Sequence, residues 1–263
     1  MSSFWDSLMI QKRVIGALLM REILTRYGRH NIGFMWLFAE PMIFTLGVTI
    51  LWNLMKGSHH LAGGMSITAF IFTGYSCLTL WRNVPGRCLT AITPNHALMF
   101  HKQVKPLDVF ISRILLELAG PTISVVTLSI VFVAAGLIKP PHDYLTTVFG
   151  WVLLGWFAAS LALLIGALSE QSEIVEKLWH PATYLLLAVS GAFFMVDDLP
   201  ASFQSVALLS PTTHCTEMFR AGFLGNHYTW HYSVSYVVVF NMSLMLIGLA
   251  QVRYISRRLV FEF

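Results

Sequence analysis

Long apolar runs recur along this sequence, and they constrain its fold more than any other feature. A helix that crosses the hydrocarbon core of a bilayer needs about 20 mostly apolar residues, because each residue adds about 1.5 Å of length. Six segments meet or nearly meet this requirement. They are residues 34–55, 66–82, 109–137, 146–168, 178–196 and 232–252. We therefore predict an all-α polytopic membrane protein with six transmembrane helices.

The composition supports this class and argues against a soluble nucleic-acid-binding protein. Hydrophobic residues make up 56% of the chain and charged residues 11%, far from the averages of soluble proteins. The basic residues flank the apolar segments, which is the pattern that orients membrane proteins. The first 30 residues keep returning to charge and lack the uninterrupted apolar core of a cleavable signal peptide. We expect a retained N-terminus and no nucleic-acid partner.

Lysine and arginine are distributed unevenly between the two sides of the predicted bundle. If the N-terminus is inside, fourteen of them lie on the cytoplasmic side and three outside. The outer three are Lys56, Lys139 and Arg220. Cytoplasmic loops carry the excess of Lys and Arg in membrane proteins, and six spans return the chain to its starting side. We therefore predict that the N and C termini are both cytoplasmic.

Two segments outside the spans are neither spanning nor ordinary loops. Residues 8–30 are too charged to span, but they place an apolar arc on one side of a helix, which predicts an N-terminal amphipathic interfacial helix. An ordinary helix packed on a partner fits the same pattern. Residues 197–231 contain two apolar stretches split by Ser210 and Pro211. They predict a periplasmic re-entrant helical hairpin before the last span, tolerated at membrane depth where protein or a cavity covers its backbone polar groups.

Motifs for nucleotide binding, metal binding and hydrolysis are absent from the sequence. A P-loop requires G-x-x-x-x-G-K-[ST], and the chain has no Gly-Lys pair. Neither H-E-x-x-H nor G-x-S-x-G occurs. His227 and His231 have i, i+4 spacing, but the sequence places no third ligand near them. We expect no catalytic residue, metal or cofactor on this chain, so that any ATP-driven transport depends on a separate ATPase.

Polar and aromatic side chains in the first two spans suggest a cavity. Glu40 lies inside the first span, where a charged side chain costs about 2.5–3.5 kcal/mol on insertion scales. It therefore needs a partner, for which Arg82 is a candidate, or a wet cavity; structural and functional roles are both open. The aromatic residues nearby should mostly face lipid or pack. A subset that faces a shared cavity could let sugar rings slide along it.

Three segments, in order along the chain, resemble type-2 ABC exporter permeases. Residues 19–41 resemble the entry to the first span, where a basic segment and a tryptophan precede a proline. Residues 94–113 resemble the N-x-x-L…Pro element, and residues 208–225 resemble the Pro-T-H…E-x-x-R element before the last span. Within this superfamily the chain is similar to the capsular-polysaccharide export family of KpsM-like inner-membrane subunits. Ser210 stands where many members have Asn.

The resemblance implies a single type-2 ABC transporter transmembrane domain over residues 1–263. Its parts are a cytoplasmic interfacial helix (1–33), spans one to five (34–196), a periplasmic re-entrant segment (197–231), and the last span with a cytoplasmic tail (232–263). It also implies a homodimer in the bacterial inner (cytoplasmic) membrane, with two copies of a cytosolic ABC ATPase subunit that binds ATP and Mg. The cargo is a lipid-linked capsular polysaccharide. Further partners are a periplasmic polysaccharide co-polymerase, an outer-membrane export channel and membrane lipids.

Roles for individual residues follow from the same resemblance. A basic rim that attracts the anionic lipid or acidic sugar end of the substrate consists of Arg21, Arg26 and Arg29. The translocation path is assigned to Trp36, Glu40, Phe72, Tyr75, Trp81 and Arg82. ATPase coupling is assigned to a short helix near residues 89–100, with Leu89, Pro94, Asn95, Leu98 and Phe100. The periplasmic gate is assigned to Pro200, Phe203, Pro211 and Phe219.

Other functions remain as alternatives. An O-antigen or teichoic-acid exporter permease keeps the class and changes the cargo. A small-lipid or drug ABC exporter permease differs mainly in the size and charge of its cavity. A membrane-embedded glycan-modifying enzyme needs a convergent acid, base or metal cluster, which the sequence does not indicate.

Overall fold

The computed structural model describes residues 4–27, 31–56, 66–99, 104–225 and 228–261, which form helices and no strand. The first half contains α1 (Phe4–Tyr27), α2 (Asn31–Lys56), α3 (Ile67–Cys88), the 3-10 turn η1 (Thr93–Asn95), α4 (His96–Met99) and α5 (Pro106–Ala134). The second half contains α6 (Tyr144–Ser169), α7 (Glu173–Leu187), η2 (Val196–Asp198), α8 (Ala201–Ala207), α9 (Pro211–Leu224) and α10 (Val234–Phe261). The predicted all-α class is confirmed for these residues.

Several of these helices are suited to a bilayer. In the described ranges, three are long and apolar enough to cross it, namely Pro106–Ala134, Tyr144–Ser169 and Val234–Arg258. They correspond to the third, fourth and sixth predicted spans. Ala39–Met55 is a shorter apolar helix inside the first predicted span. The structure thus agrees with a membrane protein, and the count of six spans stays a prediction.

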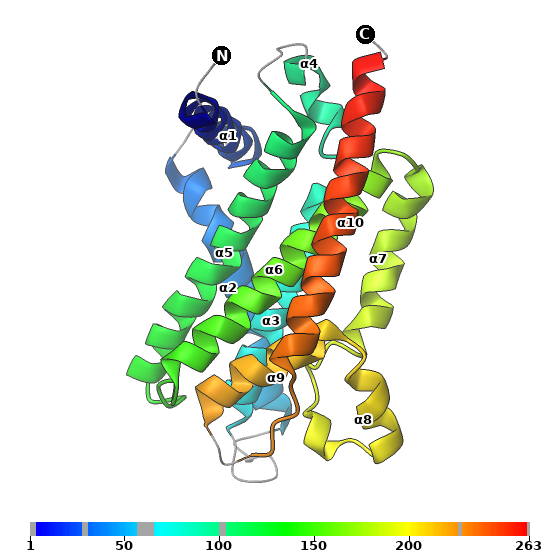
Figure 1. Ribbon diagram of the computed structural model, residues 1–263. Coiled ribbons are helices and arrows are strands. Elements are labelled where there is room, and N and C mark those ends of the chain that lie inside the picture. The colour runs from blue at the N-terminus through cyan, green and yellow to red at the C-terminus, as the bar shows by residue number, and fades with distance from the viewer. Residues whose placement is uncertain (1–3, 28–30, 57–65, 100–103, 226–227, 262–263) are drawn as a thin grey trace.

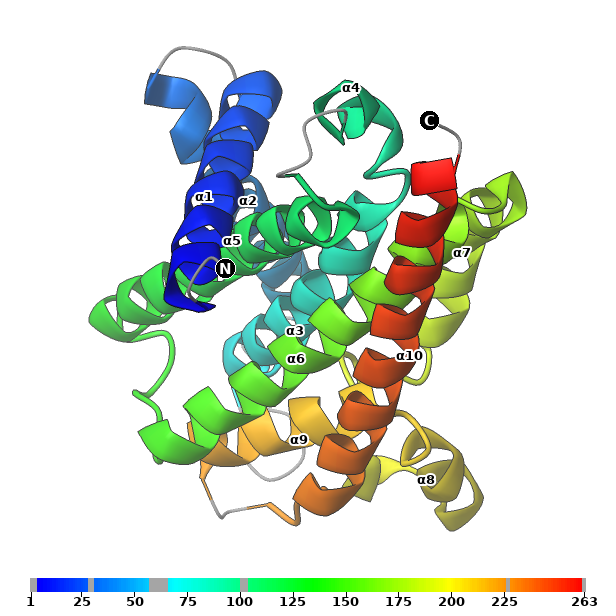
Figure 2. The ribbon, with the colours of Figure 1, turned by 45° about the horizontal axis from the view of Figure 1, so that its top comes forward.

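The long helices run side by side, with α6 in the middle of the bundle (Figure 1). α6 packs against α3, α9 and α10. α1 and the last turns of α10 lie at one end of the molecule, and α8 and α9 lie at the other (Figures 1 and 2). The first and last long helices thus meet at one end of the bundle; that this end is cytoplasmic stays a prediction.

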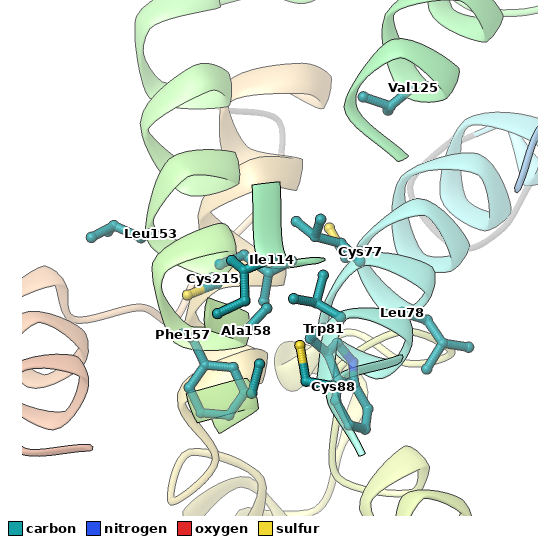
Figure 3. Close-up of a cluster of buried hydrophobic side chains, with 14 of the residues drawn as sticks. Cys77, Leu78, Trp81, Cys88, Ile114, Val125, Leu153, Phe157, Ala158 and Cys215 are labelled. Atoms are coloured by element: carbon teal, nitrogen blue, oxygen red, sulfur yellow. The ribbon is translucent and has the colours of Figure 1, made fainter. Parts of the chain in front are cut away.

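The main hydrophobic core lies around α6 and α3. Figure 3 shows part of it, with Trp81 from α3 and Phe157 from α6 drawn as sticks. Gly166 brings α6 very close to the end of α3, because a Cβ there would lie 2.6 Å from the Phe110 ring and 2.8 Å from the carbonyl oxygen of Cys88. Small residues at such contacts are how membrane helices pack without a hydrophobic driving force.

α1 packs on α5 and α2 and leaves much of its apolar surface exposed. Leu18 and Ile23 are buried against the bundle. The exposed apolar side chains are Trp5, Leu8, Met9, Ile10, Met20 and Leu24. In Figure 1 the helix is seen nearly end-on while α10 runs along the page, so α1 lies crosswise to the bundle. Lys12 and Arg13 are exposed among these apolar side chains, so α1 has no single apolar face, and its interfacial position stays a prediction.

The fifth predicted span, residues 178–196, differs from the structure. α7 begins earlier and ends at Leu187, and its 15 residues rise about 22 Å, less than the roughly 30 Å hydrocarbon core. Turns follow, with Gly191 at φ +73°. The reason lies in a distant residue: the carbonyl groups of Gly191, Ala192 and Phe194 turn toward the guanidinium of Arg220. A continuous helix would engage these carbonyls in its own hydrogen bonds.

Candidate functional site

A groove of about 560 Å³ lies between α2, α3 and α7. Its wall combines charged, polar and aromatic side chains, among them Glu40, Tyr75, Arg82, Arg87, Trp179 and His180. This mixture differs from the apolar surface that a lipid-facing crevice requires. We call these walls the charged groove.

The charged groove owes its α3 wall to helical spacing. Tyr75, Thr79, Arg82 and Gly86 lie three to four residues apart, so their side chains share one face of the helix. The opposite face of α3 is buried in the core through Cys77, Leu80 and Val84. One helix therefore serves both the core and the groove.

The carboxylate of Glu40 contacts Arg87 in the charged groove. Its Oε1 lies 3.5 Å from Arg87 Nη2, and the two side chains are 37% and 47% exposed. The sequence analysis named Arg82 as the candidate partner of Glu40, and this was wrong, because the contact is with Arg87. The prediction ended the second span at residue 82, whereas α3 continues to Cys88 and carries Arg87 on the same side as Glu40. The guanidinium of Arg82 instead lies over the Tyr184 ring, 4.9 Å from its centroid.

The other residues assigned to the path lie outside the groove. Trp36 is 53% exposed on α2. Phe72 and Trp81 are fully buried, and the Phe72 ring packs edge-on against Phe132 at a centroid distance of 5.4 Å. The structure thus brings Glu40, Tyr75 and Arg82 together and assigns the two buried aromatic residues to packing.

The predicted basic rim is only partly visible. Arg21 donates a hydrogen bond from Nη1 to Asn95 Oδ1, so it connects α1 to the segment between α3 and α5. Arg29 and the side chain of Arg26 lie outside the described residues. The described part of the rim therefore contacts the residues assigned to ATPase coupling.

Residues 89–99, here called the coupling segment, form η1 and α4 instead of the one short helix that was predicted. Asn95 is buried, and its side-chain amide donates to Ala91 O at 2.8 Å, which closes a local turn. Leu89 is also buried, Leu98 is partly buried and Pro94 is exposed. Phe100 lies outside the described residues. The segment therefore presents a short exposed tip on a buried base.

The C-terminal end of α6 holds the coupling segment in place. Glu170 accepts a hydrogen bond from the Ile92 backbone N–H at 2.5 Å and one from the Thr93 hydroxyl at 2.9 Å. Ser169 Oγ accepts from the Thr90 backbone N–H at 3.0 Å. Thr90 has φ +45°, a strained value for a β-branched residue that the neighbouring contacts must maintain. Sequence reasoning missed Glu170, whose signal was an acidic residue directly after a long apolar run.

α9, in the element assigned to the periplasmic gate, is buried along nearly its whole length. Arg220 is fully buried and donates from Nη1 to the carbonyl oxygens of Gly191 and Phe194, both at 2.7 Å, and from Nη2 to that of Ala192 at 2.6 Å. Glu217, one turn before it, accepts from two backbone N–H groups at 3.3–3.4 Å. The sequence assigned Arg220 to the outer side of the membrane, which stays a prediction; its side chain is buried, and backbone carbonyl groups solvate its charge.

The four gate residues do not share one environment. Pro200 is exposed just before α8, and Phe203 on α8 is 63% exposed. Pro211 and Phe219 are buried in α9, with the Phe219 ring 5.5 Å from that of Trp151 on α6. The hairpin therefore consists of one exposed and one buried short helix.

The beginning of α6 is tied to the end of α9. The backbone N–H of Asp143 donates to Gly222 O at 2.8 Å. The Asp143 carboxylate caps α6 by accepting from the Leu145 N–H at 2.9 Å and from the Thr146 hydroxyl at 2.6 Å. The bonds from Thr146, first its hydroxyl and then its N–H, lower the pKa of the Asp143 carboxyl. A cleft of about 920 Å³ is lined by Asp143, Leu145, Thr146 and Trp230.

Comparisons with known proteins give a consistent result over the whole chain. The family model described as ABC-2 type transporter matches residues 13–224. The capsule polysaccharide export inner-membrane protein CtrC of Neisseria meningitidis is 42% identical over 256 residues, which cover 97% of this chain and 96% of that protein. The capsule polysaccharide export inner-membrane protein BexB of Haemophilus influenzae is 40% identical with the same coverage. The polysialic acid transport protein KpsM of Escherichia coli is 25% identical over 93% of this chain and 94% of its own length.

Proposed function

Because this chain belongs to the ABC-2 type transporter family, we propose that it is the membrane subunit of an ATP-driven exporter that moves lipid-linked capsular polysaccharide from cytoplasm to periplasm. One observation carries the proposal: the capsule polysaccharide export inner-membrane proteins CtrC and BexB match 97% of the chain at 40–42% identity. Their names also support a position in the bacterial inner membrane. Apolar helices of spanning length agree with that position.

The ATPase is a separate chain in this proposal. The sequence has no P-loop, and ABC-2 permeases work with a partner that binds ATP and Mg. We assign the contact with that partner to the coupling segment, whose exposed tip includes Thr93 and Pro94. Its hydrogen bonds to Glu170 on α6 and to Arg21 on α1 support the assignment, because a docking element must pass force to the bundle without yielding.

The charged groove is the part of the translocation path that one subunit contributes. Tyr75 offers a partly exposed ring, while Arg82 and Glu40 offer charge. Shallow sites of this kind bind a polymer repeatedly without fixing one pose. We further propose that two copies of the chain form a homodimer with two ATPase subunits. A periplasmic polysaccharide co-polymerase and an outer-membrane channel complete the route.

The assembly can be tested by purifying the protein from membranes with its ATPase. We expect vanadate-sensitive ATP hydrolysis that depends on the separate ATPase and rises when a lipid-terminated acidic polysaccharide is added. In parallel, the gene should restore surface capsule to a strain that lacks its own export permease. Hydrolysis indifferent to the polymer would point to a small-lipid or drug exporter, and the absence of any ATPase partner would refute the proposal.

A further inference from the structure

The charged groove carries more positive than negative charge. Among the described residues that line it, two guanidinium groups, those of Arg82 and Arg87, oppose the one carboxylate, that of Glu40. Arg82 is kept in place by the Tyr184 ring beneath its guanidinium, a cation–π contact that leaves the N–H groups at the rim free to donate. The excess of cations favours an anionic ligand.

The contact between Glu40 and Arg87 is a loose one. The two atoms lie 3.5 Å apart and both side chains are more than a third exposed. By contrast, Arg113 and Glu22 approach to 3.2 Å with side chains only 11% and 15% exposed. Exposed ion pairs of the first kind add little stability and exchange readily with solvent or with another anion.

Glu40 is nevertheless held where it can meet Arg87. It sits in α2, one residue before the buried Pro41. On the other side, the backbone carbonyl of Arg87 accepts a hydrogen bond from Arg113 Nη1 at 3.1 Å, which fixes the last turn of α3. The two helices thus present a carboxylate and a guanidinium to each other across the mouth of the groove, while the pair itself stays open.

We propose that Glu40 is a built-in competitor for the cargo: its carboxylate occupies, at Arg87, the position that a carboxylate or phosphate of an acidic polysaccharide takes during passage. This rests on the proposed export function. A guanidinium binds either anion through its planar fork of N–H groups, so each acidic sugar can replace Glu40 and be replaced by it in turn. Exchange keeps binding weak and release fast, and an uncharged polymer has no group to displace Glu40.

Competition between Glu40 and the ligand for Arg87 predicts a dependence of binding affinity on both residues that simple charge attraction does not predict. If Glu40 competes for Arg87, removing Glu40 raises affinity for an anionic sugar chain only while Arg87 is present. If Glu40 acts through the general field of the groove, its removal raises affinity with or without Arg87. A double-mutant cycle therefore separates the two.

The test uses the permease with its ATPase in nanodiscs of phosphatidylcholine. The probes are fluorescent oligosialic acid and a dextran oligosaccharide of equal length. We expect E40Q to raise affinity for oligosialic acid about fivefold and R87Q to lower it about tenfold, in the range of charge-assisted contacts. E40Q added to R87Q should change nothing further. Dextran binding should be equal in all variants.

Matched controls come from α7. Glu173 and Lys177 form an exposed i, i+4 pair at 3.0 Å away from the groove walls, so E173Q and K177Q remove the same charges without touching the groove. They should leave oligosialic acid binding unchanged. The proposal is overturned if E40Q lowers affinity, if it raises affinity equally in the R87Q background, or if E173Q matches it.

Two further measurements distinguish a lipid from a polysaccharide as the source of the anion, and distinguish failure of this inference from failure of the export function. Adding phosphatidylglycerol to the nanodiscs should compete only weakly with oligosialic acid; if it alone binds through Arg87, the site is a lipid site and the inference fails. If wild-type protein restores capsule in cells but E40Q does not alter binding, the inference fails while the export function stands. Loss of capsule rescue by wild-type protein would instead refute the export function.

Discussion

Arg220 and Arg87 carry the same charge in opposite surroundings. Arg220 is fully buried at the junction of α9 with the turns after α7, and three carbonyl groups accept from it within 2.7 Å. Arg87 is half-exposed at the mouth of the charged groove, 3.5 Å from Glu40. A guanidinium surrounded by carbonyl groups fixes the path of the chain. One with a loose partner in an open groove is available to a ligand.

The difference follows from the cost of burying a charge. A buried ion is tolerated only when its surroundings replace the water it has lost. The N–H groups of Arg220 are therefore used in structural contacts and are not available to a ligand. Removing such a group leaves buried carbonyls unsatisfied, whereas removing Arg87 returns an exposed site to water. Stability should therefore depend on Arg220, and transport on the groove.

The largest effect is expected for Arg220→Met, which keeps most of the volume and removes the charge. It leaves three buried carbonyl groups without their donor, and each buried acceptor left unsatisfied costs about 1–3 kcal/mol. Thermal unfolding of the detergent-purified protein measures it. Arg82→Met is the control, and equal melting temperatures for the two variants would show that the contrast between them is wrong.

Gly74→Ala disturbs the same junction by adding a methyl group, without changing any charge. Its Cβ would lie 1.9 Å from Ala192 O and 2.4 Å from Arg220 Nη2, so the backbone must shift, at a cost of about 1–3 kcal/mol. At Gly47, a Cβ meets no atom of the described residues within 4 Å, and Ala there should be neutral or slightly stabilising. Chemical denaturation of both variants tests the pair; a Gly74 variant as stable as the Gly47 variant would contradict the geometry.

Glu170→Ala should separate stability from coupling. It removes the acceptors of Ile92 and Thr93, with a loss of about 1–3 kcal/mol at most, but it frees the docking tip. ATPase stimulation by the permease should fall several-fold while assembly in the membrane persists. Glu173→Ala, which breaks an exposed pair, is the control. Unchanged stimulation in the Glu170 variant would remove the coupling segment from its proposed role.

The smallest effect concerns acid stability at Asp143. Hydrogen bonds from Thr146 lower the pKa of its carboxyl in the folded state, so the ionised cap stabilises the protein fully above the unfolded-state pKa of about 3.9. That contribution is lost as the pH falls through the lower folded-state value. Asp143→Asn should therefore melt slightly below wild type at pH 6, and the gap should close toward pH 3. A gap independent of pH would assign the effect to shape.

Sequence periodicity predicted the helices well and their distant contacts poorly. The apolar runs of α5, α6 and α10 identify themselves because a bilayer demands length and hydrophobicity together. The residue at which α7 ends could not be predicted from hydropathy and length. It depends on Arg220, which lies 26 to 29 residues later in the sequence than the carbonyl groups it binds.

The candidate site shows the same division. Of the six residues assigned to the path, Glu40, Tyr75 and Arg82 line one groove, whereas Trp36, Phe72 and Trp81 lie elsewhere. The choice of Arg87 over Arg82 depended on where α3 ends, which hydropathy does not report because the last turns are polar. Glu170 could not be identified because its partners, the Ile92 backbone N–H and the Thr93 hydroxyl, lie 78 and 77 residues earlier.

α6 is one helix of 26 residues, about 39 Å long, and it is fastened at both ends. At one end Glu170 accepts hydrogen bonds from the coupling segment. At the other end Asp143 is hydrogen-bonded to α9. Nearby, Gly150 packs so closely on α9 that a Cβ there would lie 2.8 Å from Phe219 N. A rigid helix that is attached at both ends transmits displacement from one end to the other. If the ATPase pushes the coupling segment along this axis, α9 must yield or move at the same moment, so the outer end of the bundle needs no signal of its own.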